Sequence, residues 1–408
     1  MNILIINLYA GAPSMGMEYR PYNLAVNWEA DGHKVLIVTA SQHHLRSKQF
    51  NTVEKQEIRN VDGIDYLVVK TPEYHGNGFD RISNILSFLF KLILNTSRIA
   101  AEFKPDVVIA SSTIVFDIFP AKRIASLSKA KLVMEIKDLW PLSIIELGGY
   151  SRWNPFIICM QLAENYAYRN SDKVVTVLPK TLDYMVEHGL KPENFVYIPN
   201  GIITEDWNKE IEIPKQIYEL IVKIKSEQKK IIGYAGNLGI ANALGSLIDA
   251  MKLLQSEPVE LFLIGKGPER DILIKKVQNF KLKNVHFINA VPKTLIPAIL
   301  DKLDILYIGL QNQPVFRFGI SPNKLMDYMM AGKPIIQAIK AGNDITTEAN
   351  CGISIEPEDS ETIANGVKYL LTLPEEKLSE LGRNGKKYCR SHHDYRILSK
   401  KFIEAIAD

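Results

Sequence analysis

Short runs of aliphatic and β-branched residues alternate with helix-length amphipathic stretches, and this alternation constrains the fold more than any other feature of the chain. Such runs are typical of strands buried on both faces of a parallel sheet, with helices as the connections. In the first half, strands are predicted at Asn2–Asn7, Lys34–Thr39, Ile64–Lys70, Asp106–Ala110, Lys131–Ile136 and Lys173–Val177. Helices are predicted between them at 16–31, 79–103, 117–128, 153–170 and 180–188.

The alternation breaks near Ile198–Gly201 and restarts after a charged stretch that runs through Lys230. Strands are then predicted at Ile231–Ala235, Glu260–Ile264, Val285–Ile288, Ile305–Ile308, Pro334–Gln337 and Ile353–Ile355. Helices are predicted at 242–255, 268–280, 292–300, 321–331, 360–371, 375–390 and 393–406. The expected fold is α/β, with two doubly wound, Rossmann-like domains (1–200 and 201–390) that face each other across a ligand-binding cleft. The C-terminal segment 391–408 is a candidate helix for crossing back to the first domain.

Composition narrows the class of protein. The chain has 408 residues, of which 46% are hydrophobic and 23% charged, as in soluble globular proteins of two or three domains. A net charge of +3 argues against nucleic acid as a partner. The cysteines Cys159, Cys351 and Cys389 lie far apart, so neither a disulfide framework nor a metal site is predicted. With no export signal in the apolar stretch Asn2–Leu8, we expect a cytoplasmic protein.

The most lipid-like segment is Ile85–Leu94, which has 10 residues, includes Lys91 and is too short to span a bilayer. A helix that packs on a sheet is the simpler interpretation of the longer stretch Phe79–Ala101. The alternative is peripheral contact with the inner face of a membrane. That role would require exposure of Phe88, Leu89, Leu92 or Ile93 beside Lys91 and Arg98.

The segment Phe318–Ile336 carries the strongest functional signal. Ser321 is predicted to cap a helix whose first residue is Pro322. Lys324 and Asp327 then share one face of this helix. Free N–H groups at a helix start with a lysine nearby bind anions, and a carboxylate one turn later suits a sugar hydroxyl, which together suggest a nucleotide. The alternative is an ordinary capped helix with a solvated lysine.

Two loops of the first half follow predicted strands. Leu8–Glu18 contains small residues and two glycines that allow a ligand to approach the backbone, although an ordinary connection between strand and helix explains it equally well. In Glu135–Gly149, the charged pair Lys137 and Asp138 stands at a strand end, which fits a functional site. The alternative for this pair is an ion pair that caps the next helix.

Two glycine-rich turns occupy equivalent places in the second half, Gly236–Gly239 and Gly265–Pro268. Glycines between a strand and a helix suit a phosphate held by backbone N–H groups. Turns of this kind are also common as purely structural connections.

The order of these pieces resembles the family 4 retaining glycosyltransferases, which have the GT-B fold. The resemblance covers nearly the whole chain and rests on GHKVLIVTA (32–40), IPNGI (198–202), YAGNLGIANALGSLIDAM (234–251), LIGKGPER (263–270) and NKLMDYMMAGKPII (323–336). The segment EIKDLWP (135–141) is similar to a bacterial subgroup that builds O-antigen and capsule sugars.

The resemblance implies a role for individual residues. Asp327 stands where the family's second motif glutamate binds the nucleotide ribose, and Lys324 faces the diphosphate as the main catalytic group. Lys137 and Asp138 are the other catalytic candidates. The remaining donor-binding candidates are Gly16, Gly236, Asn237, Gly239, Gly265, Arg317, Ser321 and Asn323.

The chain departs from the family pattern at three places. The family's first motif glutamate would fall on Gly319, and its usual histidine after the fifth strand is Lys137 here. The basic residues that often follow the first glycine turn are replaced by Ile240–Asn242. The charge on the diphosphate is therefore expected to be met by Lys324, Arg317, Lys266 and Arg270.

The implied reaction moves a sugar from a nucleotide donor, expected to carry UDP and an N-acetylated or deoxy sugar, with retention at the anomeric carbon. The expected acceptor is a lipid-linked saccharide in surface polysaccharide synthesis. Stabilised phosphate oxygens matter most in such a site, so neither a metal nor another cofactor is expected. Two alternatives remain open, a nucleotide-sugar epimerase of the same fold and a non-enzymatic two-domain sugar-binding protein.

Overall fold

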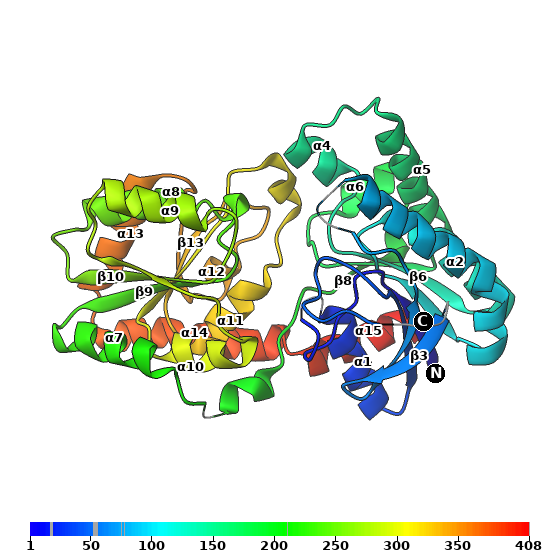
Figure 1. Cartoon of the computed structure of the whole chain (residues 1–408), viewed down its shortest axis with the longest axis horizontal. Coiled ribbons are helices and arrows are strands. Elements are labelled where there is room, and N and C mark those ends of the chain that lie inside the picture. The colour runs from blue at the N-terminus through cyan, green and yellow to red at the C-terminus, as the bar shows by residue number, and fades with distance from the viewer. Residues whose placement is uncertain (17–18, 52–55, 75, 77, 210, 408) are drawn as a thin grey trace. The chain divides into compact units, whose positions relative to one another are not determined.

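The computed structural model describes residues 1–16, 19–51, 56–74, 76, 78–209 and 211–407. The chain divides into two compact units, Met1–Asn200 with Tyr395–Asp408, and Gly201–Asp394. Each unit is a parallel or mostly parallel sheet covered by helices (Figure 1), which confirms the predicted α/β class with two Rossmann-like sheets.

In the first unit, the described residues form an eight-stranded sheet in the order β3-β4-β2-β1-β5-β6-β7-β8. All neighbouring strands in it are parallel except β3 and β4. The strands are β1 (Asn2–Ile6), β2 (Lys34–Ala40), β3 (Gln56–Val61), β4 (Ile64–Val69), β5 (Val107–Ala110), β6 (Lys131–Ile136), β7 (Lys173–Thr176) and β8 (Phe195–Tyr197). The helices are α1 (Arg20–Ala30), α2 (Phe79–Phe103), α3 (Ile118–Ser128), α4 (Leu142–Gly148), α5 (Pro155–Asn170), α6 (Leu182–Glu187) and α15 (Tyr395–Ala407).

The last helix of the chain, α15, packs against α1 of the first unit (Figure 1). The indole N–H of Trp28 donates to the backbone carbonyl of Ser399 at 3.0 Å, and the ring lies 5.2 Å from that of Phe402. Trp28 and Phe402 are both fully buried. Burial of two large aromatic rings is a strong local contribution to the docking of α15.

In the second unit, the described residues form a six-stranded parallel sheet in the order β11-β10-β9-β12-β13-β14. Its strands are β9 (Lys230–Ala235), β10 (Val259–Ile264), β11 (Val285–Ile288), β12 (Ile305–Gly309), β13 (Ile335–Ala338) and β14 (Gly352–Ile355). Its helices are α7 (Lys215–Ser226), α8 (Leu244–Leu253), α9 (Arg270–Asn279), α10 (Ile296–Asp301), α11 (Asn323–Ala331), α12 (Ile345–Glu348), α13 (Ser360–Thr372) and α14 (Glu375–His392).

Successive side chains along the strands of the second unit point to opposite faces of its sheet, so each face has its own hydrophobic core. Ile232 and Tyr234 face the core covered by α8, α9 and α13, whereas Ile231 and Ala235 face the core covered by α7, α10, α11 and α14 (Figure 1). Because both of their faces are buried, the inner strands β9, β10, β12 and β13 are mostly apolar, which is why the sequence shows them as aliphatic runs.

Helix α2 packs on the sheet, as the simpler interpretation of Phe79–Ala101 predicted. Phe88 and Leu92 are fully buried and Leu89 is 8% exposed, whereas Ile93 is 39% exposed and is the one of the four candidates that could contact a membrane. The reason is that α2 is apolar on two sides, and the side that carries Phe88 and Leu92 covers the sheet.

Candidate functional site

Helix α11 begins at Asn323, and Pro322 occupies the capping position with an extended backbone (φ −74°, ψ 125°). The expectation that Ser321 caps this helix and that Pro322 is its first residue is therefore wrong by one position. The N–H of Ile320 donates to the side-chain oxygen of Asn343 at 2.8 Å, and the side-chain nitrogen of Asn343 donates to the carbonyl of Ile320 at 3.0 Å. This tertiary contact keeps the backbone before α11 extended as far as Pro322. The local capping signal at Ser321 therefore does not determine where the helix begins.

Lys324, in the first turn of α11, reaches the carboxyl end of β9. Its ammonium group donates to the hydroxyl of Tyr234 at 2.8 Å and to the side-chain oxygen of Asn242 at 2.5 Å. It also lies 4.5 Å from the centroid of the Tyr234 ring. Burial lowers the pKa of Lys324 to about 8. The site thus holds a desolvated cation on a fixed pair of polar groups.

The turn Gly236–Gly239 supports the two partners of Lys324. The backbone carbonyl of Asn237 accepts from the Tyr234 hydroxyl at 2.6 Å and from the Asn242 amide at 3.0 Å. A Cβ on Gly236 would lie 3.0 Å from the Lys324 side chain, and a Cβ on Gly239 would lie 2.9 Å from the Asn237 amide. Small residues here therefore allow the lysine and the turn to pack together.

The second glycine turn packs directly on the first. A Cβ on Gly265 would lie 1.9 Å from the carbonyl oxygen of Gly236, so only glycine fits this contact. The N–H of Leu238 donates to the carbonyl of Lys266 at 2.9 Å. The structure thus brings Gly236, Asn237, Gly239 and Gly265 together beside Lys324, while the N–H groups of Gly236 and Gly265 donate to the carbonyls of Ile264 and Ile288.

Asp327 lies one turn after Lys324 and is 7% exposed. Its carboxylate forms an ion pair with Lys293, which is part of the short helix Lys293–Leu295 after β11. Burial raises the pKa of Asp327, and the charge and hydrogen bond of Lys293 oppose that rise. Sequence reasoning missed Lys293, as it missed Tyr234 and Asn242, because these contacts join segments far apart in the chain.

Two other candidate cations of the same unit lie in the short helix Pro314–Phe318 and at the start of α9. Arg317 donates to the carbonyl of Pro314 at 2.7 Å, and its guanidinium lies 4.3 Å from the centroid of the Phe318 ring. Arg270 donates to the side chain of Asn289 at 3.1 Å, at the end of β11. Asn323, at the start of α11, is exposed.

In the first unit, Lys137 follows β6 directly and is half-buried, whereas Asp138 is exposed. Burial raises the pKa of the neighbouring Asp117 to about 7, while hydrogen bonds from Ser112 and the charge of Lys137 oppose the rise. The positive charge of Lys137 thus favours the ionised form of the buried Asp117 carboxylate. Helix α4 is preceded by Pro141, so the structure gives no support for a cap from the charged pair.

Gly16 is positioned by the segment that follows β2. Its φ of +84° is strained for other residues, and a Cβ there would lie 2.9 Å from the hydroxyl of Ser47. The N–H of Ser47 donates to the carbonyl of Met15 at 2.9 Å. The end of the predicted loop Leu8–Glu18 falls on residues 17–18, which lie outside the described residues.

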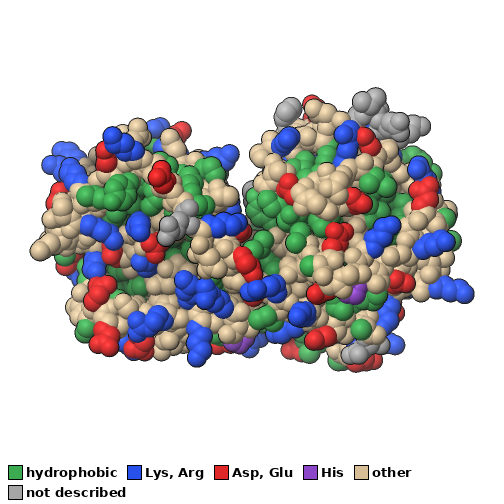
Figure 2. All heavy atoms as spheres, turned by 90° about the horizontal axis from the view of Figure 1, so that it is seen from below, with side chains coloured by type: hydrophobic (Ala, Val, Ile, Leu, Met, Phe, Trp, Pro, Cys, Tyr) green, Lys and Arg blue, Asp and Glu red, His purple; other side chains and the backbone are tan. Residues whose placement is uncertain are grey.

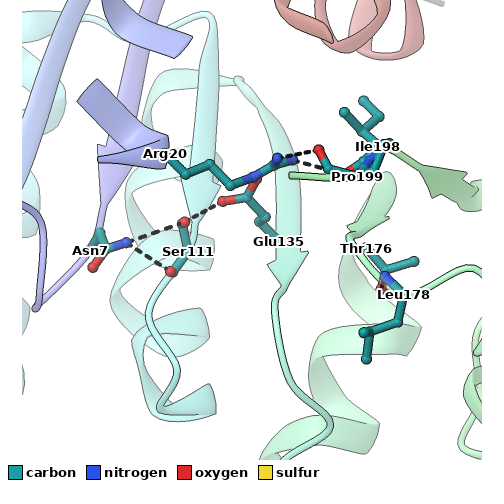
Figure 3. Close-up of polar contacts among 8 residues, drawn as sticks. All are labelled: Asn7, Arg20, Ser111, Glu135, Thr176, Leu178, Ile198 and Pro199. Carbon is teal, nitrogen blue, oxygen red and sulfur yellow. Dashed lines mark hydrogen bonds and ion pairs between the residues drawn. The ribbon is translucent and has the colours of Figure 1, made fainter. Parts of the chain in front are cut away.

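A buried polar network ties the strand ends of the first unit together (Figure 3). Arg20 donates to the Glu135 carboxylate at 2.8 Å, and to the carbonyls of Pro199 at 2.6 Å and Ile198 at 3.0 Å. Ser111 donates to the other oxygen of Glu135. Arg20 and Glu135 are 5% and 3% exposed. Arg20 therefore fixes the segment just before the chain leaves the first unit.

Two features bear on metals and membranes. Within the described residues, no three His, Cys, Asp or Glu side chains gather in a way that would hold a metal ion. Over the same residues, no helix combines the length and apolar character needed to cross a membrane. Acidic and basic side chains are interspersed over the face shown in Figure 2.

Comparison with known proteins identifies the class. Residues 219–388 match the family model of glycosyl transferases group 1, and residues 15–201 match that of the glycosyl transferase 4-like domain. A protein of Escherichia coli K12, WcaI, named for a proposed role as a colanic acid biosynthesis glycosyl transferase, is 24% identical over 364 residues, which cover 86% of this chain and 87% of that protein. These matches identify the chain as a glycosyltransferase.

Solved structures of low sequence identity share the fold over the whole chain. Sucrose-phosphate synthase from Thermosynechococcus elongatus has a TM-score of 0.75 at 14% identity and covers 99% of this chain and 97% of its own. HepE of Anabaena, solved with UDP-glucose, has a TM-score of 0.68 at 16% identity and covers 100% and 99%. The protein is thus a glycosyltransferase with the GT-B fold, and the epimerase alternative is not favoured.

Proposed function

We propose that the enzyme transfers a sugar from a UDP-linked donor, with retention at the anomeric carbon, to a lipid-linked saccharide in surface polysaccharide synthesis. The observation that carries the proposal is Lys324, held as a desolvated cation at the start of α11 beside two glycine turns. The UDP-glucose named in the HepE structure supports the nucleotide, and the colanic acid role named for the Escherichia coli relative supports the polysaccharide.

In this proposal the donor diphosphate binds at the start of α11. Backbone N–H groups near Ser321 and Asn323 and in the Gly236–Gly239 turn, at Asn237 and Gly239, are proposed to receive phosphate oxygens, because such groups carry partial positive charge. The N–H groups of Gly236 and Gly265 already donate to the carbonyls of Ile264 and Ile288, so these two glycines contribute close approach of the backbone. Arg317 adds a second cation from the preceding short helix Pro314–Phe318. Lys324 contacts the bridging region where negative charge grows as the sugar leaves. A metal is not required, since these groups supply the positive charge.

In the first unit we propose that Gly16 allows the backbone to approach the donor phosphate and sugar. Lys137 and Asp138 are proposed to face the reacting sugar or the acceptor from the end of β6. Lys137 takes the place of the family's histidine and brings a positive charge instead of a base. Asp138, which is exposed, is the better candidate for contact with an acceptor hydroxyl.

The proposed function is tested with a panel of nucleotide sugars, with and without a lipid-diphosphate saccharide acceptor, followed by mass analysis. Transfer is expected as a mass increase on the lipid, in EDTA as well as without it. A donor that changes in the absence of acceptor would indicate an epimerase and contradict the proposal. Absence of any product over the whole panel would contradict it as well.

The ribose role of Asp327 gives a separate prediction. Asp327→Ala is expected to raise the donor KM and to lower kcat/KM at least tenfold, about 1.4 kcal/mol, because charge-assisted hydrogen bonds to the ribose hydroxyls are lost. Asp327→Glu is expected to retain activity, since the family carries glutamate there. Unchanged kinetics for Asp327→Ala with a normal melting curve would remove this residue from the donor site.

We further propose peripheral contact with the inner face of a membrane through the outer side of α2. Phe79, Leu86, Phe90 and Leu94 are 58–89% exposed on this side, although the opposite side is already buried in the core. A surface helix normally carries polar residues outside, so the second apolar side needs another explanation. A lipid surface fits, because the proposed acceptor is attached to lipid.

The membrane contact predicts that the protein floats with anionic liposomes. Leu86→Asp and Phe90→Asp are expected to reduce the bound fraction severalfold without unfolding the protein, since both side chains are exposed. Ile272→Asp, at an exposed apolar residue of the second unit, is the matched control and should bind as the wild type does. Wild-type protein that stays in the soluble fraction would contradict the proposal.

A further inference from the structure

The ion pair between Lys293 and Asp327 points to a positioning role that the family resemblance does not assign. Asp327 belongs to α11, whereas Lys293 comes from the short helix Lys293–Leu295 after β11, 34 residues earlier. The aspartate side chain is 10% exposed and the lysine side chain 54%. The pair therefore joins a carboxylate in the protein interior to a cation at the surface.

A carboxylate buried to this degree takes up a proton unless a partner stabilises its charge. Burial raises the pKa of Asp327, and Lys293 is the charged group that opposes the rise within the described part of the chain. Tyr328 of the same helix and Cys389 of α14 are the other titratable groups beside it, and burial, with a contribution from Asp327, raises the pKa of both. Neither can stabilise a negative charge at Asp327 as a cation does.

The protonation state of Asp327 matters because of what it is proposed to bind. An ionised carboxylate accepts hydrogen bonds from two neighbouring hydroxyl groups, and these charge-assisted bonds are about twice as strong as neutral ones. A protonated carboxyl loses the charge and commits one oxygen as a donor. The ribose site is therefore strong only while Asp327 is ionised.

We propose that Lys293 is a positioning residue that keeps Asp327 ionised and oriented for the donor ribose at neutral pH. It acts through the carboxylate and need not contact the nucleotide. The compact ammonium on a flexible stem can stay on one carboxylate oxygen while hydroxyl groups approach the other. This inference rests on the proposed donor site and adds the group that sets its pH range.

The direction of the pH effect follows from the charges. Without Lys293 the pKa of Asp327 rises further, so the carboxylate takes up a proton at a higher pH than in the wild type. Relative to the wild type at the same pH, the nucleotide affinity of Lys293→Met should then fall by about tenfold as the pH is lowered from about 8.5 to about 6. The comparison is made at each pH because Lys324 and the UDP phosphate titrate over this range with both proteins. At the alkaline end the variant should approach wild-type affinity.

The test is calorimetric titration with UDP and with 2′,3′-dideoxy-UDP over this pH range. Lys293→Arg should restore the wild-type dependence of affinity on pH, because it restores the charge. Asp327→Asn and the double variant Lys293→Met with Asp327→Asn should bind UDP weakly at every pH. Lys302→Met is the matched control, since Lys302 pairs with Asp301 on an exposed surface of the same unit, and it should behave as the wild type does.

The outcomes separate the inference from the function on which it rests. If Lys293→Met matches the wild type in affinity at every pH while Asp327→Asn binds weakly, the role of Lys293 alone is overturned. Equal binding of UDP and dideoxy-UDP by the wild type would overturn the ribose site itself. If Lys293→Met unfolds, Lys293→Gln is used, and a wild-type profile in that folded variant overturns the inference equally.

Discussion

Replacement of Lys324 by alanine is expected to lower kcat by about 10²–10³, with a much smaller effect on donor affinity. Negative charge grows on the leaving diphosphate, so a cation aimed at it stabilises the transition state more than the bound substrate. The lysine is already desolvated and held by Tyr234 and Asn242, so it needs little reorganisation at the moment of reaction. Its loss should therefore affect turnover most.

The measurement is kcat for sugar transfer beside the dissociation constant for UDP. Lys324→Arg should recover only part of the rate, because a planar fork does not replace a point charge between Tyr234 and Asn242. Tyr234→Phe keeps the ring and removes the two hydrogen bonds of the hydroxyl, with Lys324 and with the Asn237 carbonyl, and it should cost less than Lys324→Ala. If Lys324→Ala keeps full turnover, the anion site lies elsewhere, and Arg317 is the next candidate.

The pKa of Lys324 adds a pH dependence to this prediction. Burial lowers the pKa to about 8, so the free enzyme loses this positive charge as the pH rises through about 8. The value of kcat/KM is therefore expected to fall above that pH. A bound diphosphate favours the charged form, so the fall in kcat should begin at higher pH. For Lys324→Arg, neither kcat/KM nor kcat should fall at alkaline pH, because arginine stays charged there.

The fold was predictable because each strand buried on both faces leaves a continuous aliphatic run. The missed elements are those that lack this signal. Strand β3 (Gln56–Val61) is an edge strand with a mostly exposed or half-exposed surface, so its sequence is polar. Helix α7 (Lys215–Ser226) buries only Ile217, Ile221 and Ile224, which have helical spacing. Most of its other residues are charged or polar, so the sequence indicates a charged stretch there and the helix is missed.

The candidate site was predictable where it depends on spacing within one element. Lys324 and Asp327 lie on one helix, and the glycine turns stand at strand ends, as expected. Tyr234, Asn242 and Lys293 reach the site through tertiary contacts, which no local pattern specifies. The same limit explains α2: two sides of this helix are apolar, and only packing decides that Phe88 faces the sheet and Phe90 the surface.

The ion pair between Arg20 and Glu135 gives the largest predicted effect on stability. Arg20→Met is expected to lower the free energy of unfolding of the first unit by about 3–5 kcal/mol, because it leaves a buried carboxylate without its cation. Two backbone carbonyls, those of Ile198 and Pro199, lose their donor as well. The pair between Arg98 and Glu102 is exposed on α2, so Arg98→Met is the control and should cost less than about 0.5 kcal/mol.

The measurement must report on the first unit alone, since the two units can unfold separately. Three of the four tryptophans lie in that unit, and the fourth, Trp207, lies in the second. Urea unfolding followed by tryptophan fluorescence in a Trp207→Phe background therefore isolates the transition.

The pH dependence of the same transition supplies an independent check on Glu135. Burial by itself would raise the pKa of this carboxyl, but Arg20, Lys137 and Ser111 bring it below its ordinary value of 4.5. A lowered pKa means that the stabilising contribution is complete above about pH 4.5 and is lost as the pH falls further. Glu135→Gln should remove that acid-side slope. A loss below about 1 kcal/mol for Arg20→Met would contradict the predicted role, whereas a double variant with Glu135→Leu should be more stable than Arg20→Met alone, because the unpaired charge is gone.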